Sequence, residues 1–322
     1  MDKKEQHITS IGGQAIIEGV MMRGPHKTAM AVRKPDKEIV VEINENGTKK
    51  RNKFLKLPIV RGCVNFIDSL VVGMKALMFS ADFMDLEDEE PSESKFDKWL
   101  NDKFGDKIKD IVIYVSIALS LVLSVGLFIL LPTLIADLFS WIISFTPIKE
   151  VLNSASFKPI IEGITRMAIF VLYLWLVSFM SDIKRVFEYH GAEHKTISCY
   201  EAGEELTIEN VKKHTRFHPR CGTSFLLFVM IISIIVYSIL PQQANFILRI
   251  LMRLALLPVI AGLSYEIIKL AGRSKNKCVC FLTKPGLWLQ KLTTREPDDS
   301  QIEVAIKSMQ AVIPENSEDD KW

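Results

Sequence analysis

An uninterrupted apolar run is the feature that most constrains what this chain can fold into. Residues 111–131 contain no charged side chain, and about 20 apolar residues are enough for a helix to cross the hydrocarbon core of a bilayer. Three further apolar runs occupy residues 160–180, 224–240 and 247–270. We therefore expect a mainly α-helical, polytopic membrane protein with about four transmembrane helices, which form a bundle over residues 111–270.

Lysine and arginine are distributed unevenly between the segments that flank these runs. Segments 95–110, 181–223 and 269–296 carry 19 of them, whereas loops 132–159 and 241–246 carry 2. Because cytoplasmic loops are enriched in lysine and arginine, both termini and the loop 181–223 are predicted to lie on the cytoplasmic side of an inner (cytoplasmic) membrane. The net charge of +2 gives no reason to expect a nucleic acid partner.

Six ionisable residues fall inside two of the predicted helices. Glu266 and Lys269 have the spacing of an i,i+3 pair on the helix surface, and the other four are Glu162, Arg166, Arg249 and Arg253. Charged groups inside a membrane are energetically costly and often functional. These four lie within a turn or two of a predicted helix end. We therefore expect them to reach the membrane interface with their charged ends rather than to pair inside the bundle.

The rest of the chain divides into four segments. Residues 1–58 are predicted to be a β-rich cytoplasmic part, and residues 59–84 have a helical apolar period broken by charges, which favours an amphipathic or re-entrant helix. Residues 85–110 form an acidic linker and lead-in. Residues 271–322 form a cytoplasmic C-terminal segment with a helix over residues 298–312 and a disordered tail.

A glycine-rich stretch at residues 12–25 lies within the β-rich part. It lacks the glycine spacing of a nucleotide-binding loop, so we interpret it as a strand with bulges and tight turns. The alternative is that Glu18 and Arg23 face a functional site. Farther along, Thr28–Arg33 and Glu38–Ile43 are rich in β-branched residues and predict a hairpin.

Four of the six histidines lie close together in the predicted cytoplasmic loop: His190, His194, His214 and His218. If the preceding helix continues, His190 and His194 lie one turn apart on one face and are able to bind one ion. Glu193 completes an H-x-x-E-H pattern, in which two histidines hold zinc and the glutamate activates a bound water. The short pattern also occurs by chance.

The second histidine pair directly precedes the apolar run at residues 224–240. Pro219 disfavours helix at His218, which makes Cys221 a better companion ligand than His214. Antiparallel helices on either side of the loop would bring the two pairs together. We predict a divalent metal site, most simply zinc, with Glu193 as the catalytic residue and ligands drawn from His190, His194, His214, His218, Cys221 and Glu188. The alternative is a hydrogen-bonded structural cluster.

Five long motifs stand out along the chain: GGQAIIEGVMMRGP at 12–25, RGCVNFIDSLVVGMKAL at 61–77, FEYHGAEHKTISCYE at 187–201, HPRCGTSFLL at 218–227 and PGLWLQKLTTREPDDSQIEVAI at 285–306. Together they resemble the YqhQ family of bacterial membrane proteins. The resemblance covers nearly the whole chain and implies a membrane protein of a family described as metal-dependent enzymes of unknown function. It supplies no substrate and no catalytic residue.

These observations lead to three hypotheses of different classes. The first is a metal-dependent membrane enzyme, hydrolytic, whose site at the cytoplasmic interface acts on a lipid, a membrane peptide or another amphiphile. The second is a transport or ion-sensing protein, although the apolar runs lack the broken-helix pair typical of a midplane site. The third is a metal-free scaffold or assembly factor. The lipid bilayer is the expected surrounding in all three.

Overall fold

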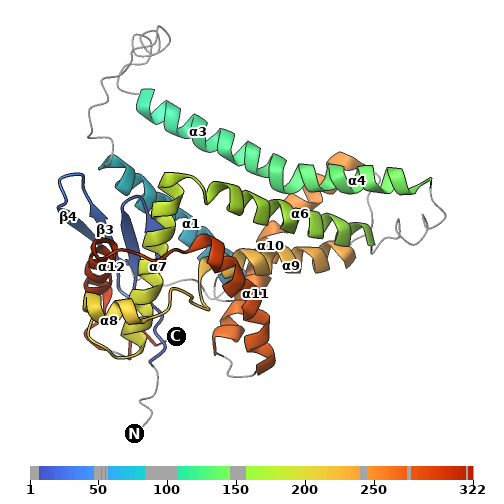
Figure 1. Cartoon of the computed structure of the whole chain (residues 1–322). Helices are drawn as coiled ribbons and strands as arrows, with labels where there is room; N and C mark the ends of the chain where they lie inside the picture. The colour runs from blue at the N-terminus through green and yellow to red at the C-terminus, as the bar shows by residue number, and fades with distance from the viewer. Residues whose placement is uncertain are drawn as a thin grey trace. The chain divides into compact units, whose positions relative to one another are not determined.

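The computed structural model shows a mainly helical chain with one small sheet (Figure 1). It separates into two compact units, which are described one at a time. Unit 1 comprises Met1–Asp85, Tyr173–Ile232 and Leu256–Trp322, and unit 2 comprises Leu86–Leu172 and Ser233–Ala255. The structure describes residues 7–46, 52, 55, 57–83, 108–145, 157–239, 245–273, 277–316 and 318–321. Most of the predicted linker at residues 85–110 therefore lies outside the described residues.

Unit 1 begins with a four-stranded antiparallel sheet. Its strands follow in chain order, β1 (Gly12–Ile16), β2 (Gly19–Arg23), β3 (Lys27–Arg33) and β4 (Ile39–Glu45). This confirms the β-rich N-terminal part, and the hairpin expected from the β-branched runs is the β3–β4 pair. The glycine-rich stretch forms the β1–β2 hairpin, as its interpretation as strand and tight turn requires.

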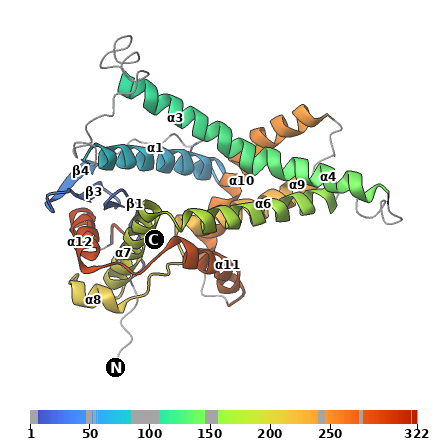
Figure 2. The same cartoon turned by 45° about the horizontal axis from the view of Figure 1, so that its top comes forward.

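Helices cover both faces of this sheet (Figure 2). Side chains alternate between the faces along β2 and β3, as the period of a strand dictates. One set packs against α7 (Ser181–Glu201) and α12 (Asp299–Val312), and it contains Val20, Met22, Ala29 and Ala31. The other set packs against α1 (Val60–Asp82), and it contains Met21, Met30 and Val32. The two central strands are therefore buried on both sides.

The helix α1 carries apolar side chains on two opposite faces, one buried and one exposed. Ala76 is fully buried against the sheet, whereas the opposite face carries an exposed apolar stripe. At the other end, Arg61 donates two hydrogen bonds to Glu266 of α10 (Phe246–Arg273). A helix is present where one was predicted, at residues 59–84, whereas its amphipathic or re-entrant placement at a membrane surface stays a prediction. The stripe consists of Ile67, Leu70, Val71, Met74 and Met78.

Among the described residues, five helices are long and apolar enough to cross a membrane, rather than about four. The additional one is α1, which was not predicted as a transmembrane helix because charged residues interrupt its apolar period. The others are Val115–Ile143, α6 (Phe157–Val177), α9 (Gly222–Ile239) and the Phe246–Leu270 part of α10.

The first apolar run is longer than expected. α3 (Ile108–Val125) passes through a π-helical turn, η3 (Gly126–Leu130), into α4 (Leu131–Ile143). The expected boundary at residue 131 is therefore wrong. Proline is tolerated near a helix start, and the wide turn before Pro132 relieves the clash that would end a regular α-helix there.

Unit 2 contains a buried ionic network. Arg166 and Arg253 donate to opposite oxygens of Glu162, at 2.8 and 2.5 Å, and all three side chains are more than nine-tenths buried. Arg253 also donates to the hydroxyl of Thr133 at 2.6 Å. The expectation that these charges reach the interface is wrong because partners from neighbouring helices satisfy them inside the unit. Arg249 likewise pairs with Asp137 at 2.6 Å.

The C-terminal segment closes unit 1. α12 begins as predicted, with a capping box formed by Asp298 and Gln301. The tail after it is not disordered over its described residues, because Asp320 is fully buried. Its carboxylate accepts hydrogen bonds from the hydroxyls of Thr9 and Tyr200, at 2.6 and 3.0 Å. The tail was expected to be disordered because it is rich in charged residues, and its sequence does not indicate the burial of Asp320.

Candidate metal centre

Two histidines lie one turn apart on α7. α6 ends at Val177, and α7 starts after a short turn at Ser181, so the pair belongs to a separate helix rather than to a continuation of the membrane helix. The spacing still places both imidazoles on one face, and the ring centroids of His190 and His194 are 4.4 Å apart. The predicted histidine pair is therefore present with the geometry that its spacing implies.

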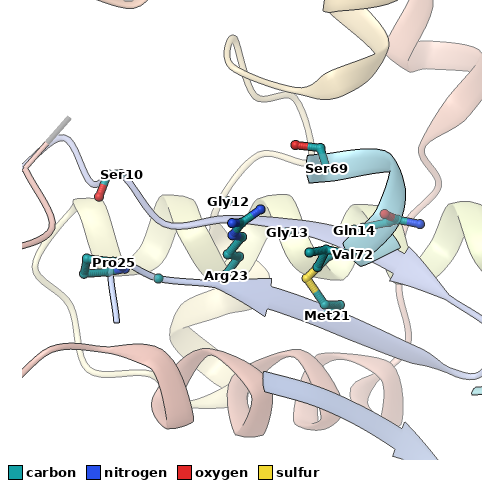
Figure 3. Close-up of a pocket in the computed structure, with 10 residues that line it drawn as sticks. Ser10, Gly12, Gly13, Gln14, Met21, Arg23, Pro25, Ser69 and Val72 are labelled. Atoms are coloured by element: carbon teal, nitrogen blue, oxygen red, sulfur yellow. The ribbon is translucent and has the colours of Figure 1, made fainter. Parts of the chain in front are cut away.

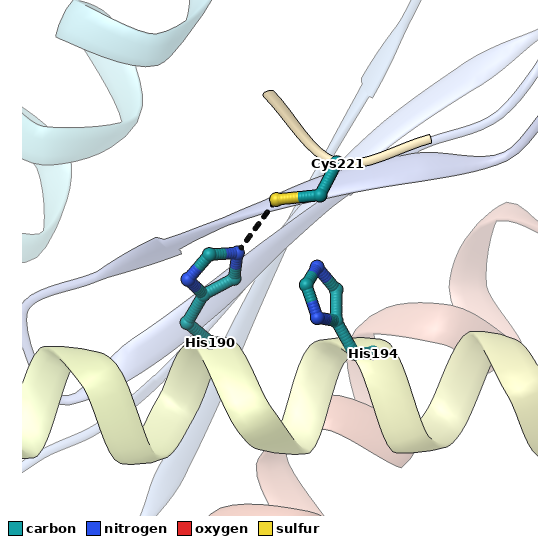
Figure 4. A group of neighbouring side chains, drawn as sticks. All are labelled: His190, His194 and Cys221. Carbon is teal, nitrogen blue, oxygen red and sulfur yellow. Dashed lines mark hydrogen bonds between the residues drawn. The ribbon is translucent and has the colours of Figure 1, made fainter. Parts of the chain in front are cut away.

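Cys221 completes a three-residue group with them. It ends the turn that leads into α9, and its Sγ lies 3.2 Å from Nε2 of His190. One ligand atom from each of His190, His194 and Cys221 lies within 4.8 Å of the others. Both rings rise from α7 toward the cysteine (Figure 4). We call these three residues the HHC group.

Backbone carbonyls orient both imidazoles. Nδ1 of His190 lies 2.8 Å from the carbonyl oxygen of Thr293, and Nδ1 of His194 lies 2.6 Å from that of Arg216. A carbonyl accepts only, so each Nδ1 carries a proton, and each Nε2 is turned toward the centre of the group, where that of His190 contacts Sγ of Cys221. Nε2 of His194 is buried and has no hydrogen-bond partner among the described residues. A bound cation would satisfy this nitrogen.

Charge within the HHC group favours a thiolate. Burial alone would raise the pKa of Cys221, but the neighbouring imidazoles of His190 and His194 outweigh it and hold that pKa well below its usual range. Burial opposes protonation of His190, yet the nearby Cys221 raises the pKa of this histidine to about 9. The thiolate is the form of cysteine that binds metals and acts as a nucleophile.

Glu193 lies between the HHC group and the sheet. Its side chain is buried, which raises its pKa, while the imidazoles of His194 and His190 and a hydrogen bond from the Gly13 amide oppose that shift. A Cβ atom on Gly13 would come within 2.9 Å of Cγ of Glu193. The glycine therefore gives the carboxylate its place against β1.

His218 lies beside the HHC group but is turned to other partners. Its ring centroid is 5.6 Å from that of His194. Its Nε2 lies 3.6 Å from the carboxylate of Glu201 and 3.3 Å from the guanidinium of Arg220. Burial is the main reason that the pKa of His218 is lowered. In this arrangement it borders the group rather than joining it.

His214 and Glu188, the two remaining predicted ligands, are not brought to the HHC group. His214 ends α8 (Ile208–Lys213) and lies near Cys199 and Glu204. Burial raises the pKa of Cys199 to about 11, so this second group offers a protonated thiol, which is a poor ligand. Glu188 faces α12, where it accepts a hydrogen bond of 3.0 Å from Gln301.

One residue that supports the site, Gln290, was not predicted from the sequence. Gln290 of α11 (Lys277–Thr293) is fully buried and clamps the turn before α9: its Oε1 accepts from the amide of His218, and its Nε2 donates to the carbonyl of the same residue. Glu201, a carboxylate near the end of α7, forms an ion pair with Arg220. The polar Gln290 within an otherwise apolar motif was the available signal.

Comparison with known proteins places the chain in a family. The family model described as a protein of unknown function (DUF1385) matches residues 57–315. The uncharacterized protein YqhQ of Bacillus subtilis (strain 168) is 38% identical over 304 residues, which cover 94% of this chain and 92% of the relative. No solved structure matches. The chain therefore belongs to the YqhQ family, whose members carry the description of a domain of unknown function.

Proposed function

We propose that this protein is a metal-dependent hydrolase of the membrane surface, with a divalent ion, most simply zinc, held by the HHC group. One observation carries the proposal: carbonyls hold Nδ1 of both imidazoles, so that Nε2 of His190 contacts Sγ of Cys221, and Nε2 of His194 is buried beside them without a hydrogen-bond partner among the described residues. Three nitrogen and sulfur ligands with a fourth position open are typical of catalytic zinc sites.

The chemistry follows from the donor set. A bound divalent ion would lower the pKa of water and polarise a carbonyl or phosphoryl oxygen of the substrate. Glu193 would accept the proton of the attacking water and later return it to the leaving group, which balances hydrolysis. His218, Glu201 and Arg220 form a polar wall beside the group, suited to holding a substrate oxygen.

The site is proposed to lie on the cytoplasmic side, with both termini. The sheet and α7 pack together in unit 1, so they share one side of any membrane. Three helices of spanning length separate them along the chain: α1, the helix Val115–Ile143 and α6. A return to the same side takes an even number of crossings, so if any of these three helices cross, two of them cross and one does not.

We infer that α1 is the helix that does not cross. It has the lowest mean hydropathy of the five. Its second half packs on the sheet, where the Ile17 amide donates to the hydroxyl of Ser80 at 3.2 Å. Its exposed apolar stripe would then rest in the membrane interface. Four crossings remain, in agreement with the lysine and arginine distribution.

Metal analysis tests the proposal. We expect the protein purified in detergent to hold about one divalent ion per chain, and the double variant His190→Ala/His194→Ala to hold almost none. His26→Ala, which changes an exposed histidine outside the site, is the matched control. Equal, substoichiometric metal in all three proteins would contradict the proposal.

A second candidate function is metal-free acyl transfer, favoured by the 3.2 Å contact between Nε2 of His190 and Sγ of Cys221. The thiolate would attack an acyl carbon, and the imidazolium would protonate the departing alcohol or amine. The neutral imidazole would then take a proton from an acceptor alcohol, amine or water, which attacks the thioester, accepts the acyl group and releases the thiolate. Turnover that survives complete removal of metal and disappears in Cys221→Ser would favour this reading over the first.

A further inference from the structure

A second feature of unit 1 is a pocket of about 320 Å³ next to β1 (Figure 3). Strand β1, the end of β2 and the middle of α1 form its walls. Arg23 is the one charged residue among those that line it. The polar part of the lining consists of Ser10, Gln14, Arg23 and Ser69, and backbone at Gly12 and Gly13 completes it.

Arg23 reaches from β2 toward the glycines of β1 (Figure 3). It lies opposite Gly12 in the sheet register, and a Cβ atom on Gly12 would meet nothing within 4 Å. Among the described residues, no carboxylate pairs with Arg23. A half-buried guanidinium without a carboxylate partner leaves this pocket with net positive charge, which favours an anionic ligand.

The donors around Arg23 suit an oxyanion with several oxygens. The guanidinium presents a planar fork of N–H groups that matches phosphate. The hydroxyls of Ser10 and Ser69 and the amide of Gln14 supply further donors. None of the lining side chains is an acidic group that would repel such an anion.

The pocket and the candidate catalytic carboxylate meet at one residue. Gly13 lines the pocket, and its amide hydrogen-bonds to Glu193. Because Gly13 has no side chain, backbone alone separates the two.

The helix on the other side of the pocket points to a source for the anion. Ser69 and Val72 of α1 line the pocket, whereas Leu70, Val71 and Met74 belong to its exposed apolar stripe. If that stripe rests in the membrane, the pocket lies at the depth of lipid headgroups.

We propose that this pocket binds the phosphate group of a membrane lipid headgroup. The charge and lining of the pocket carry this proposal, and only the further step, that the bound lipid is also the substrate, rests on the proposed function.

Lipid binding to the full-length protein, measured by native mass spectrometry from detergent, tests the proposal. The probes are dihexanoyl phosphatidic acid, the neutral dihexanoylglycerol and inorganic phosphate. We expect phosphatidic acid to bind and dihexanoylglycerol not to bind. Arg23→Gln is expected to weaken phosphatidic acid binding about tenfold or more, because a charge-assisted contact is lost. Arg33→Gln, which removes an arginine that pairs with Glu303 at the far end of β3, is the matched control and should bind normally.

The outcomes test the pocket, the source of the phosphate and the hydrolase separately. Equal binding to wild type and Arg23→Gln, or equal binding of the neutral lipid, would overturn the pocket assignment. Inorganic phosphate that binds as tightly as the lipid, in an Arg23-dependent way, would support the phosphate site and overturn the lipid source. Metal content of the same samples reports separately on the proposed function, since Arg23-dependent binding without metal would sustain the pocket and remove the hydrolase.

Discussion

Gly12 and Gly13 are neighbours in β1 with opposite structural demands. A Cβ atom on Gly13 would lie 2.7 Å from the carbonyl oxygen of Met21 and 2.9 Å from Cγ of Glu193, whereas one on Gly12 would meet nothing within 4 Å. Contacts below 3.0 Å force neighbouring atoms to move, and here one of them is backbone. The site therefore requires glycine at residue 13, whereas the space around residue 12 would accept a side chain.

This difference makes a prediction at the residue scale. We expect Gly13→Ala to lower the free energy of unfolding by about 1–3 kcal/mol, as overpacking does, and to displace Glu193. Thermal unfolding in detergent measures the effect, with Gly12→Ala as the matched control. Equal melting temperatures for the two variants would show that Glu193 does not rest against Gly13.

A second prediction concerns Asp320. Asp320→Ala removes a buried carboxylate that two hydroxyls contact, and hydrogen bonds to a charged group contribute about 1.5–3 kcal/mol. We expect destabilisation of that size, together with faster proteolysis of the N-terminal residues that Asp320 holds. Asp319→Ala, at an exposed position beside it, should change neither property. If both variants behave alike, the C-terminal tail does not anchor the N-terminus.

The residues of the site differ in how far sequence could predict them. The four-residue spacing of His190 and His194 fixes their relation within a helix, so it was predictable. Cys221 was predicted because Pro219 disfavours helix before it and leaves a turn at the start of the apolar run. Glu188 and His214 were also predicted as ligands, but they have other neighbours in the structure. The direction in which each points depends on packing against α12 and on the end of α8, which no local pattern encodes.

At the scale of elements, the buried network of unit 2 links helices that are far apart in sequence. Glu162 of α6 accepts from Arg166 on its own helix and from Arg253 of α10. Gly163 lets α6 and α9 approach closely, since a Cβ atom there would overlap Ile234. Sequence showed these charges near helix ends, but their partners follow only from how the helices assemble.

Removal of the shared carboxylate should be costly. Glu162→Gln would leave two buried arginines without their counter-charge, and breaking a buried ion pair from one side costs about 3–5 kcal/mol. We expect a strong loss of folded protein in detergent, measured by size-exclusion chromatography and thermal unfolding. The control Glu205→Gln changes an exposed glutamate. A Glu162→Gln protein as stable as this control would mean that the network contributes little.

At the scale of the whole molecule, hydropathy identifies the helices that are long and apolar enough to cross a membrane, but not which of them do so. Four of the five were predicted from apolar length, and α1 was predicted as an amphipathic helix. Only the packing of the sheet against both α1 and α7 supplies the parity argument, because it fixes the two ends of the intervening chain to one side. The amino-acid composition of a segment does not predict this packing.

Labelling of single cysteines in intact cells checks this topology. With an impermeant maleimide, Lys37→Cys in the β3–β4 turn and Lys98→Cys in the linker should both stay unlabelled until the cells are opened. Asn153→Cys, between the second and third spanning helices, should be labelled from outside. Labelling of Lys98→Cys from outside would mean that α1 crosses the membrane.

The central claim is that His190, His194 and Cys221 form a metal centre, and cobalt substitution tests it most directly. We expect the metal-free protein to bind Co²⁺ with a thiolate-to-cobalt charge-transfer absorption, which Cys221→Ser abolishes and Cys199→Ser leaves unchanged. Such a band directly reports sulfur coordination, and Cys199 belongs to the alternative group of potential ligands. The absence of this absorption in the unsubstituted protein, or its loss in Cys199→Ser alone, would contradict the account.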